Sequence, residues 1–197
     1  PPPPPPPPPT PPQFDRRRQR QMCIRDSVYK GVLYAGLMLV EEQDSITPYV
    51  LEINIRQGDP EAQVILPRLE TDLVDISEAI VQGRLHEISP KWNPDYRLCL
   101  IAVSGRTKGK KGWYKGYPER YKIGLPIHGL DDIDPECLVV HSGTGFGGEG
   151  QLITTGGRVL CIVSRGKTLQ EAREKAYAEM EKVEFTGRYY RSDIGKE

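Results

Sequence analysis

One short stretch of the sequence decides the fold: LEINIRQGDPE, at positions 51–61. Along 51–56 it alternates apolar and polar residues, which is the pattern of a β-strand buried on one face only. The apolar face carries Leu51, Ile53 and Ile55. The other face carries Glu52, Asn54 and Arg56. We expect the apolar face to be buried and the polar face to line an open, partly solvated groove.

The polar face of this strand has the chemistry of a metal–phosphate site. Glu52 and Asn54 offer a carboxylate and an amide oxygen, which are hard ligands of the kind that Mg²⁺ takes together with phosphate and water. Arg56 adds a planar, permanently charged fork that matches phosphate oxygens. A surface ladder of salt bridges is the alternative interpretation of the same side chains.

The end of the stretch predicts the start of a helix. Asp59 is a good N-cap and Pro60 suits the first helical position, and we expect the helix to end or kink near Pro67. The free N–H groups at such a helix start attract anions. Asp59 and Glu61 are also candidates for holding an amine substrate, with helix capping and dipole complementation as the alternative.

Flanking segments predict a hairpin and a second helix. Residues 28–40 form a β-rich apolar run and 41–47 a polar turn, so that 49–56 returns as an antiparallel strand. Farther on, 72–82 has apolar residues at helical spacing, and Gly83 is its predicted stop.

The remainder predicts a second unit of strands with a closing helix. The predicted strands are 98–103, 138–141, 151–155 and 158–164. We expect the last two to form a hairpin around Gly156 and Gly157. In the final helix, Thr168 and Glu171 make a capping box. The apolar stripe of that helix, which we expect to be core, is Leu169, Ala172, Ala176, Met180 and Val183.

Several motifs, in a fixed order, carry a resemblance to a known family. They are GVLYAGLM at 31–38, EINIRQGDPEAQVILP at 52–67, PKWN at 90–93, VHSGT at 140–144, TGGRVL at 155–160, GKTL at 166–169 and YYRSDIG at 189–195. Together they resemble the phosphoribosylamine–glycine ligase (glycinamide ribonucleotide synthetase) family of ATP-grasp enzymes. The resemblance runs from about residue 28 to the C-terminus.

The resemblance implies an α+β fold in two parts. Residues 28–85 resemble the end of an ATP-grasp domain, with antiparallel strands plus helices. Residues 86–197 resemble the C-terminal domain of this family, a small mixed β-sheet with a closing helix. On this interpretation the chain is a fragment that lacks the upstream lid and most nucleotide contacts, and the fragment alone is expected to be inactive.

The first 27 residues are expected to lie outside the fold. They are proline-rich and then basic, and QMCIRDS at 21–27 resembles a translated sequencing adapter. We therefore expect an irregular, artefactual segment. A proline-rich ligand followed by a basic tail is the alternative.

The resemblance also implies a reaction and a set of site residues. The reaction is ATP-dependent ligation of glycine to 5-phosphoribosylamine, giving glycinamide ribonucleotide, ADP and phosphate in purine biosynthesis. Glu52 and Asn54 would hold Mg²⁺ or Mn²⁺, and Arg56 would be the catalytic residue that stabilises the transferring phosphoryl group. The implied partners are ATP, glycine and 5-phosphoribosylamine, with no nucleic acid and no membrane. We expect a monomer in the cytoplasm.

Composition and charge fit that interpretation. The formal net charge is +0 and the pI is about 7.3, so nothing global favours nucleic acid or an anionic membrane. No apolar run reaches the roughly 18 residues of a membrane helix. The cysteines lack metal or disulfide spacing and are expected to be reduced, buried or incidental thiols. His141 is expected to be a hydrogen-bonded core histidine, and the Gly-rich 143–148 a hairpin loop rather than a phosphate loop.

Two alternative functions remain open from the sequence. One is another ATP-grasp carboxylate–amine ligase, because Glu-x-Asn recurs across that superfamily. The other is a non-catalytic module in which the basic, aromatic segment 106–122 binds RNA or a protein partner. Salt-dependent RNA binding would favour the module, and binding of a magnesium nucleotide would favour a ligase.

Overall fold

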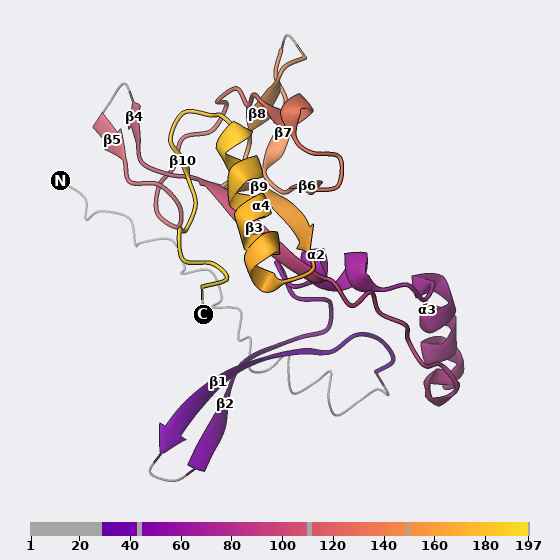
Figure 1. Ribbon diagram of the computed structural model, residues 1–197. Coiled ribbons are helices and arrows are strands. Elements are labelled where there is room, and N and C mark those ends of the chain that lie inside the picture. Colours follow the sequence, from indigo (N-terminus) through magenta and orange to yellow (C-terminus); the bar gives the residue numbers. More distant parts are fainter. Residues whose placement is uncertain (1–28, 43–44, 110–111, 149, 197) are drawn as a thin grey trace, which may run out of the picture.

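The computed structural model describes residues 29–42, 45–109, 112–148 and 150–196. Within these ranges the chain has the predicted α+β class, with antiparallel sheets and few helices (Figure 1). The segment 1–27, which the sequence set apart, lies outside the described residues together with its Cys23. None of the helices in the described ranges has the length and apolar character needed to cross a bilayer.

The predicted hairpin is confirmed, with different bounds. Strand β1 (Tyr34–Glu42) pairs antiparallel with β2 (Ser45–Asn54), and the ladder runs from Tyr34 opposite Asn54 to Glu42 opposite Ser45. The strands therefore extend into the residues expected to form a turn. At the other end β2 stops at Asn54, because the chain bends at Ile55 and Arg56.

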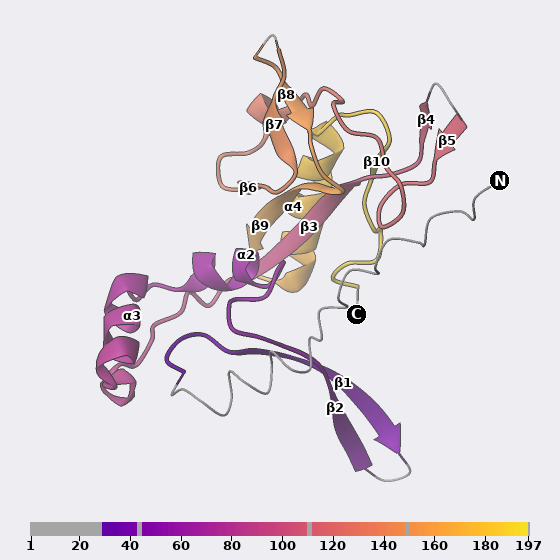
Figure 2. The ribbon, with the colours of Figure 1, turned by 180° about the vertical axis from the view of Figure 1, so that it is seen from behind.

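The expected burial of the hairpin's apolar face is wrong. Leu51, Ile53 and Ile55 are 59%, 40% and 61% exposed. Figures 1 and 2 show the reason, since β1 and β2 extend away from the rest of the described chain as a two-stranded ribbon. Alternation predicted the strand correctly, but it could not say whether another layer covers it.

Short helices connect the hairpin to the main sheet. They are α2 (Ala62–Ile65), the 3₁₀ helix η1 (Leu66–Arg68), α3 (Leu73–Gln82) and the 3₁₀ helix η2 (Leu85–Glu87). The predicted change at Pro67 is confirmed, because α2 gives way to η1 there. The predicted start is wrong: the N-cap position is Glu61, and it makes no side-chain cap.

Helix α3 begins and ends as its sequence predicts. The carboxylate of Asp72 accepts a hydrogen bond of 2.7 Å from the backbone N–H of Val74. Gly83 ends the helix with a φ of 74°, a left-handed conformation that glycine adopts without strain. Of its expected apolar stripe only Ala79 is buried, and Leu73 is 44% exposed.

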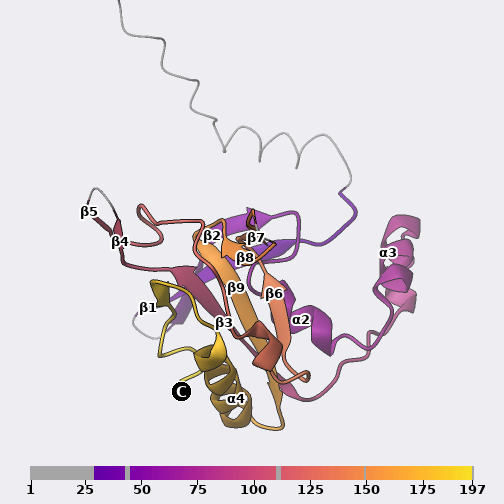
Figure 3. The same ribbon diagram turned by 90° about the horizontal axis from the view of Figure 1, so that it is seen from above.

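The core surrounds a second, four-stranded sheet. Its strands, in the order β10-β3-β9-β6, are β10 (Arg188–Tyr189), β3 (Tyr96–Ser104), β9 (Arg158–Gly166) and β6 (Leu138–His141). Every neighbouring pair is antiparallel, whereas the sequence predicted a mixed sheet. Seen from above, helix α4 (Leu169–Lys182) lies along one face of this sheet (Figure 3).

Helix α4 begins and packs as its capping box and its apolar stripe predict. The hydroxyl of Thr168 accepts from the N–H of Glu171 at 3.1 Å. The Glu171 carboxylate accepts from the N–H of Lys167, one residue before the position that a standard capping box uses. Fully buried residues of the predicted stripe are Ala172, Ala176, Met180 and Val183. The interpretation of Met180 as a core residue is confirmed.

The remaining elements are small hairpins and a turn of 3₁₀ helix. They are β4 (Thr107–Gly109) with β5 (Gly112–Tyr114), η3 (Leu130–Asp132), and β7 (Thr144–Phe146) with β8 (Leu152–Thr154). The predicted hairpin around Gly156 and Gly157 is wrong, because β8 pairs with β7 and β9 pairs with β3 and β6.

Gly156 and Gly157 do not form a hairpin turn. They lie where other segments of the chain pass too close for a side chain to fit. A Cβ on Gly143 would lie 2.6 Å from the Cα of Gly156. A Cβ on Gly157 would lie 2.3 Å from the ring of Tyr117. Side chains at these positions would therefore push apart segments that cross in the fold. The Gly-rich 143–148, predicted to be a hairpin loop, does belong to a hairpin, but its residues 144–146 form strand β7 rather than the loop.

Candidate functional site

The two predicted metal ligands share one face of the hairpin. Glu52 and Asn54 occupy alternate positions of β2, opposite Gly36 and Tyr34 of β1. The Glu52 side chain passes closely over Gly36, where a Cβ would lie 3.0 Å from the Glu52 Cγ. Glu52 is exposed and Asn54 half-buried. A carboxylate and an amide oxygen therefore face the same open side.

A third carboxylate contacts Tyr34, the residue of β1 opposite Asn54. The loop after β2 carries Glu61 back to β1, where its Oε1 accepts a hydrogen bond of 3.1 Å from the hydroxyl of Tyr34. That hydrogen bond is the main reason why the pKa of Tyr34 is raised; burial and the nearby charges of Glu61 and Glu52 raise it further. The phenol therefore stays a donor at neutral pH. Sequence reasoning missed Tyr34, whose only signal is its place in the motif at 31–38.

Arg56 does not stand in line with Glu52 and Asn54. The strand ends before it, and its exposed guanidinium donates to the carbonyl oxygen of its neighbour Gln57 at 2.7 Å. Helix α2 has only four residues, too few for a helix terminus that binds anions. The predicted continuous ladder of polar side chains along 52–56 is thus interrupted by the bend. The catalytic role of Arg56 stays a prediction.

Asp59 makes contacts that the capping prediction did not foresee. Its Oδ1 accepts from Nε2 of Gln63 at 2.8 Å, and its Oδ2 accepts from Nη1 of Arg158 at 3.1 Å. Arg158 is the first residue of β9 and lies 99 positions farther along the chain. The pair ties the loop after β2 to the main sheet. Only the motif TGGRVL hinted at Arg158, and no local pattern predicts its partner.

The donor set fits a divalent cation that phosphate and water complete. Oxygen ligands from Glu52 and Asn54, with Glu61 close by, are those that hard cations prefer. In the described part of the chain, no group of three or more His, Cys, Asp or Glu side chains is placed to hold a metal by itself. Mg²⁺ usually takes only one or two carboxylates from the protein.

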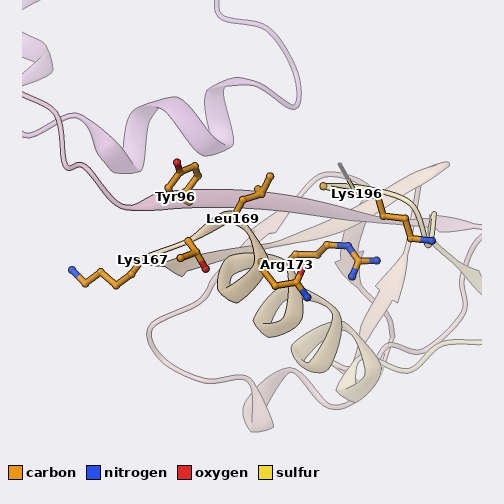
Figure 4. Close-up of a pocket in the computed structure, with 8 residues that line it drawn as sticks. Tyr96, Lys167, Leu169, Arg173 and Lys196 are labelled. Carbon is orange, nitrogen blue, oxygen red and sulfur yellow. The ribbon is translucent and has the colours of Figure 1, made fainter.

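The pocket shown in Figure 4 lies elsewhere, at the start of α4, and has a volume of about 580 Å³. Lys167 and Arg173, two of the basic residues that line it, have structural partners. Nζ of Lys167 lies 2.9 Å from Oδ1 of the buried Asp95. The guanidinium of Arg173 donates to the carbonyl oxygens of Ile194 and Ser192 at 3.1 and 3.0 Å. The two hydrogen bonds of Arg173 fasten the C-terminal segment to α4.

The basic, aromatic segment 106–122 is also occupied with its own contacts. Arg106 lies over the ring of Trp113 at 4.6 Å, and Arg120 over the ring of Tyr114 at 5.1 Å. Lys115 pairs with Glu119 at 2.9 Å. Each of these two rings thus has one face covered by an arginine, while Trp113 is still 61% exposed. The binding of RNA or a protein partner by this segment stays an untested alternative.

Among the described residues, no group of three or more histidines, cysteines and carboxylates is placed to hold a metal ion. His141 is exposed at the end of β6, with its Nδ1 3.0 Å from Oγ1 of Thr144. It is hydrogen-bonded as predicted, but the prediction that it belongs to the core is wrong. Cys99, Cys137 and Cys161 are free thiols, and burial raises the pKa of Cys137.

Comparison with known families decides what these features belong to. The model described as phosphoribosylglycinamide synthetase, C domain, matches residues 114–197. The model described as phosphoribosylglycinamide synthetase, ATP-grasp (A) domain, matches residues 16–62. The chain belongs to the phosphoribosylamine–glycine ligase family. The A-domain match includes the stretch 51–61, and it begins inside the segment 1–27.

Individual relatives of the phosphoribosylamine–glycine ligase family agree. The chain is 44% identical over 170 residues to a phosphoribosylamine–glycine ligase of Archaeoglobus fulgidus, covering 86% of this chain and 36% of that one. It is 48% identical over 167 residues to the one of Caldanaerobacter subterraneus subsp. tengcongensis, covering 85% and 36%. A crystal structure of the Thermotoga maritima ligase superposes with a TM-score of 0.61 at 35% identity, over 82% of this chain and 36% of that chain.

These matches confirm the predicted family and fold. Because both the A and the C domain of one family are matched, they favour that family over other ATP-grasp ligases. The chain spans about a third of the length of the relatives it matches.

Proposed function

We propose that this protein takes part in the ATP-dependent ligation of glycine to 5-phosphoribosylamine, which forms glycinamide ribonucleotide, ADP and phosphate in purine biosynthesis. The observation that carries the proposal is the face of the hairpin that presents Glu52 and Asn54 next to Glu61, in a chain of the phosphoribosylamine–glycine ligase family. The relatives bear the name of that reaction.

Glu52 and Asn54 would hold a divalent cation, Mg²⁺ or Mn²⁺, against the nucleotide phosphates. The cation, when bound, offsets negative charge as the phosphoryl group moves. The protein's own part is to present two oxygen ligands on one face of a strand pair. Their exposure leaves room for the phosphate and water ligands that a two-residue site requires.

The charged groups of the loop would receive the other substrates. Glu61, with Asp59 beside Arg158, offers carboxylates to an amine-bearing substrate. Arg56 has no carboxylate partner among the contacts described above, since its guanidinium donates to the carbonyl of Gln57. A rotation of this exposed side chain would place a planar fork against the acyl phosphate that forms from glycine and ATP.

The reaction and its site are tested together in the complete gene product that contains this sequence. We expect ADP formation that requires both glycine and phosphoribosylamine. Glu52→Gln and Asn54→Ala should each lower kcat roughly 100-fold or more while the Tm stays unchanged, because neither side chain serves the core. The 197-residue polypeptide by itself is expected to form no ADP.

Glu41→Gln is the matched control, since Glu41 is an exposed carboxylate on the same hairpin. It should leave kcat within about twofold of the parent, as expected of a surface change away from the site. ADP formation without glycine dependence would refute the reaction. A Glu52→Gln protein with full activity would refute the site.

A further inference from the structure

Tyr34 stands beside the proposed metal ligands on the paired strand. It is the first residue of β1 and lies opposite Asn54, while Gly36 lies opposite Glu52. Directly opposed residues of an antiparallel pair project to the same face, with Cβ atoms about 4.5–5.5 Å apart. The side chain of Tyr34 therefore lies on the face that carries Glu52 and Asn54.

From that position the Tyr34 hydroxyl reaches the loop after β2. It donates a part-buried hydrogen bond of 3.1 Å to Oε1 of Glu61. The approach requires a glycine, because a Cβ on Gly58 would lie 2.3 Å from Oε2 of Glu61 and 2.9 Å from Cε2 of Tyr34. A phenol and a carboxylate thus meet where the backbone leaves room for both.

Another tyrosine near this hairpin shows what a purely structural hydroxyl does. The hydroxyl of Tyr29 donates to the backbone carbonyls of Val32 and Ile55 at 2.9 and 3.0 Å. Backbone carbonyls are present whatever the sequence. Tyr34 instead binds an ionisable side chain, and hydrogen bonds to charged groups are stronger and more directional than neutral ones.

We propose that Tyr34 is a positioning residue of the ligase: it holds the Glu61 carboxylate on the Glu52–Asn54 face, where the amine-bearing substrate is received. The inference rests on the proposed function, which assigns the substrate amine to Glu61. Tyr34 touches no reacting atom and acts through Glu61 alone. Without the hydroxyl, the carboxylate is free to rotate away, so substrate binding suffers more than phosphoryl transfer.

The first test is kinetic and uses the complete gene product. Tyr34→Phe should raise the KM for an amine-bearing substrate, glycine or phosphoribosylamine, roughly tenfold, the size expected for one hydrogen bond to a charged group. The KM for ATP and the Tm should stay at parent values. Tyr189→Phe is the matched control, because Tyr189 is exposed on β10 at 58%, and it should change none of these quantities.

A double-mutant cycle shows whether Tyr34 acts through Glu61. In a Glu61→Gln background, Tyr34→Phe should add no further loss, because the partner that the hydroxyl positions is already altered. If the effects of Tyr34→Phe and Glu61→Gln on the KM for the amine-bearing substrate multiply in the double variant, the proposal is overturned. A KM for ATP that rises as much as the KM for the amine-bearing substrate would also overturn it.

A second test reads the contact without any turnover. With ¹³Cζ-labelled tyrosine in the complete gene product, Tyr34→Phe identifies the Tyr34 resonance at neutral pH. Glu61→Ala should move that resonance, and Asp59→Ala, which removes the neighbouring carboxylate, should not. An unmoved resonance overturns the proposal whatever the activity. Absence of glycine-dependent ADP formation in the parent would refute the proposed reaction instead, so the two failures are distinguishable.

Discussion

At the scale of single residues, two of the carboxylates in the loop after β2 are each held by a side chain from a distant segment. Tyr34 fixes Glu61 from the hairpin side, and Arg158 fixes Asp59 from the side of the main sheet. Both contacts join segments far apart in the sequence. They set the position of the loop without contributing to the apolar core, so their loss should appear in activity before it appears in stability.

Arg158→Met tests this separation. Its ion pair with Asp59 is 40% and 51% exposed, so the free energy of unfolding should fall by less than about 1 kcal/mol in urea titration. In the complete gene product, kcat/KM should fall roughly tenfold, because Asp59 loses the donor that orients it. Lys115→Met, which breaks the exposed pair with Glu119, should change neither quantity. A loss of several kcal/mol would instead show that Arg158 is structural.

The residue scale also shows where sequence reasoning succeeds and fails. That Glu52 and Asn54 share a face follows from strand alternation, which is a local property. Arg56 was placed wrongly because the strand ends at a bend that no side-chain pattern announces. Tyr34 and Arg158 were missed because their partners are set by strand register and by packing of distant segments, which alternation does not contain.

At the scale of elements, helices α3 and α4 were predictable, whereas the pairing of β8 and β9 was not. α3 and α4 each begin with a capping side chain, and α3 ends at a left-handed glycine, so local chemistry sufficed. The pairing of β8 with β7 and of β9 with β3 was not predictable, since 151–155 and 158–164 look like neighbours in sequence. Their separation depends on the crossing of Gly143 and Gly156, a contact between segments that turn chemistry does not reveal.

Asp95 provides a test of how β3 and β9 are joined. Its side chain is 5% exposed and receives hydrogen bonds from Lys167 and Arg165, which lower its pKa. A carboxyl with a lowered folded-state pKa adds stability above its unfolded pKa of about 3.9, and that contribution disappears as the pH falls through the folded value. Asp95→Asn should therefore destabilise the protein at pH 7, and the difference from the parent should shrink below about pH 4.

Urea titrations at a series of pH values measure this difference directly. Asp131→Asn is the control, because Asp131 is exposed in η3, and it should follow the parent at every pH. A constant penalty for Asp95→Asn across the range would mean that shape rather than charge joins the two strands.

At the scale of the whole molecule, the described chain combines a packed unit with an uncovered hairpin. Residues 159–164 of β9 are buried on both faces of the main sheet. The β1–β2 ribbon, by contrast, exposes apolar side chains on both of its faces. Those that are at least half exposed include Leu37, Met38, Leu39, Ile46, Val50 and Leu51. A two-stranded hairpin of this kind is marginal in water unless another surface packs against it.

The exposed apolar faces of the hairpin predict that the 197-residue polypeptide self-associates through it. That the complete ligase is a monomer is a separate prediction, which stays untested. A contiguous apolar patch of this kind is an association site, and Leu39 and Val50 are 63% and 61% exposed in it. Sedimentation at rising concentration should show oligomers that bind a hydrophobic dye, and Leu39→Lys with Val50→Lys should return the polypeptide to monomers. Val74→Lys with Val81→Lys on α3, which adds the same charge at 62% and 66% exposed positions, should not. Monomers at every concentration, with no dye bound, would contradict the prediction, because they would require the apolar faces of the hairpin to be covered within a single chain.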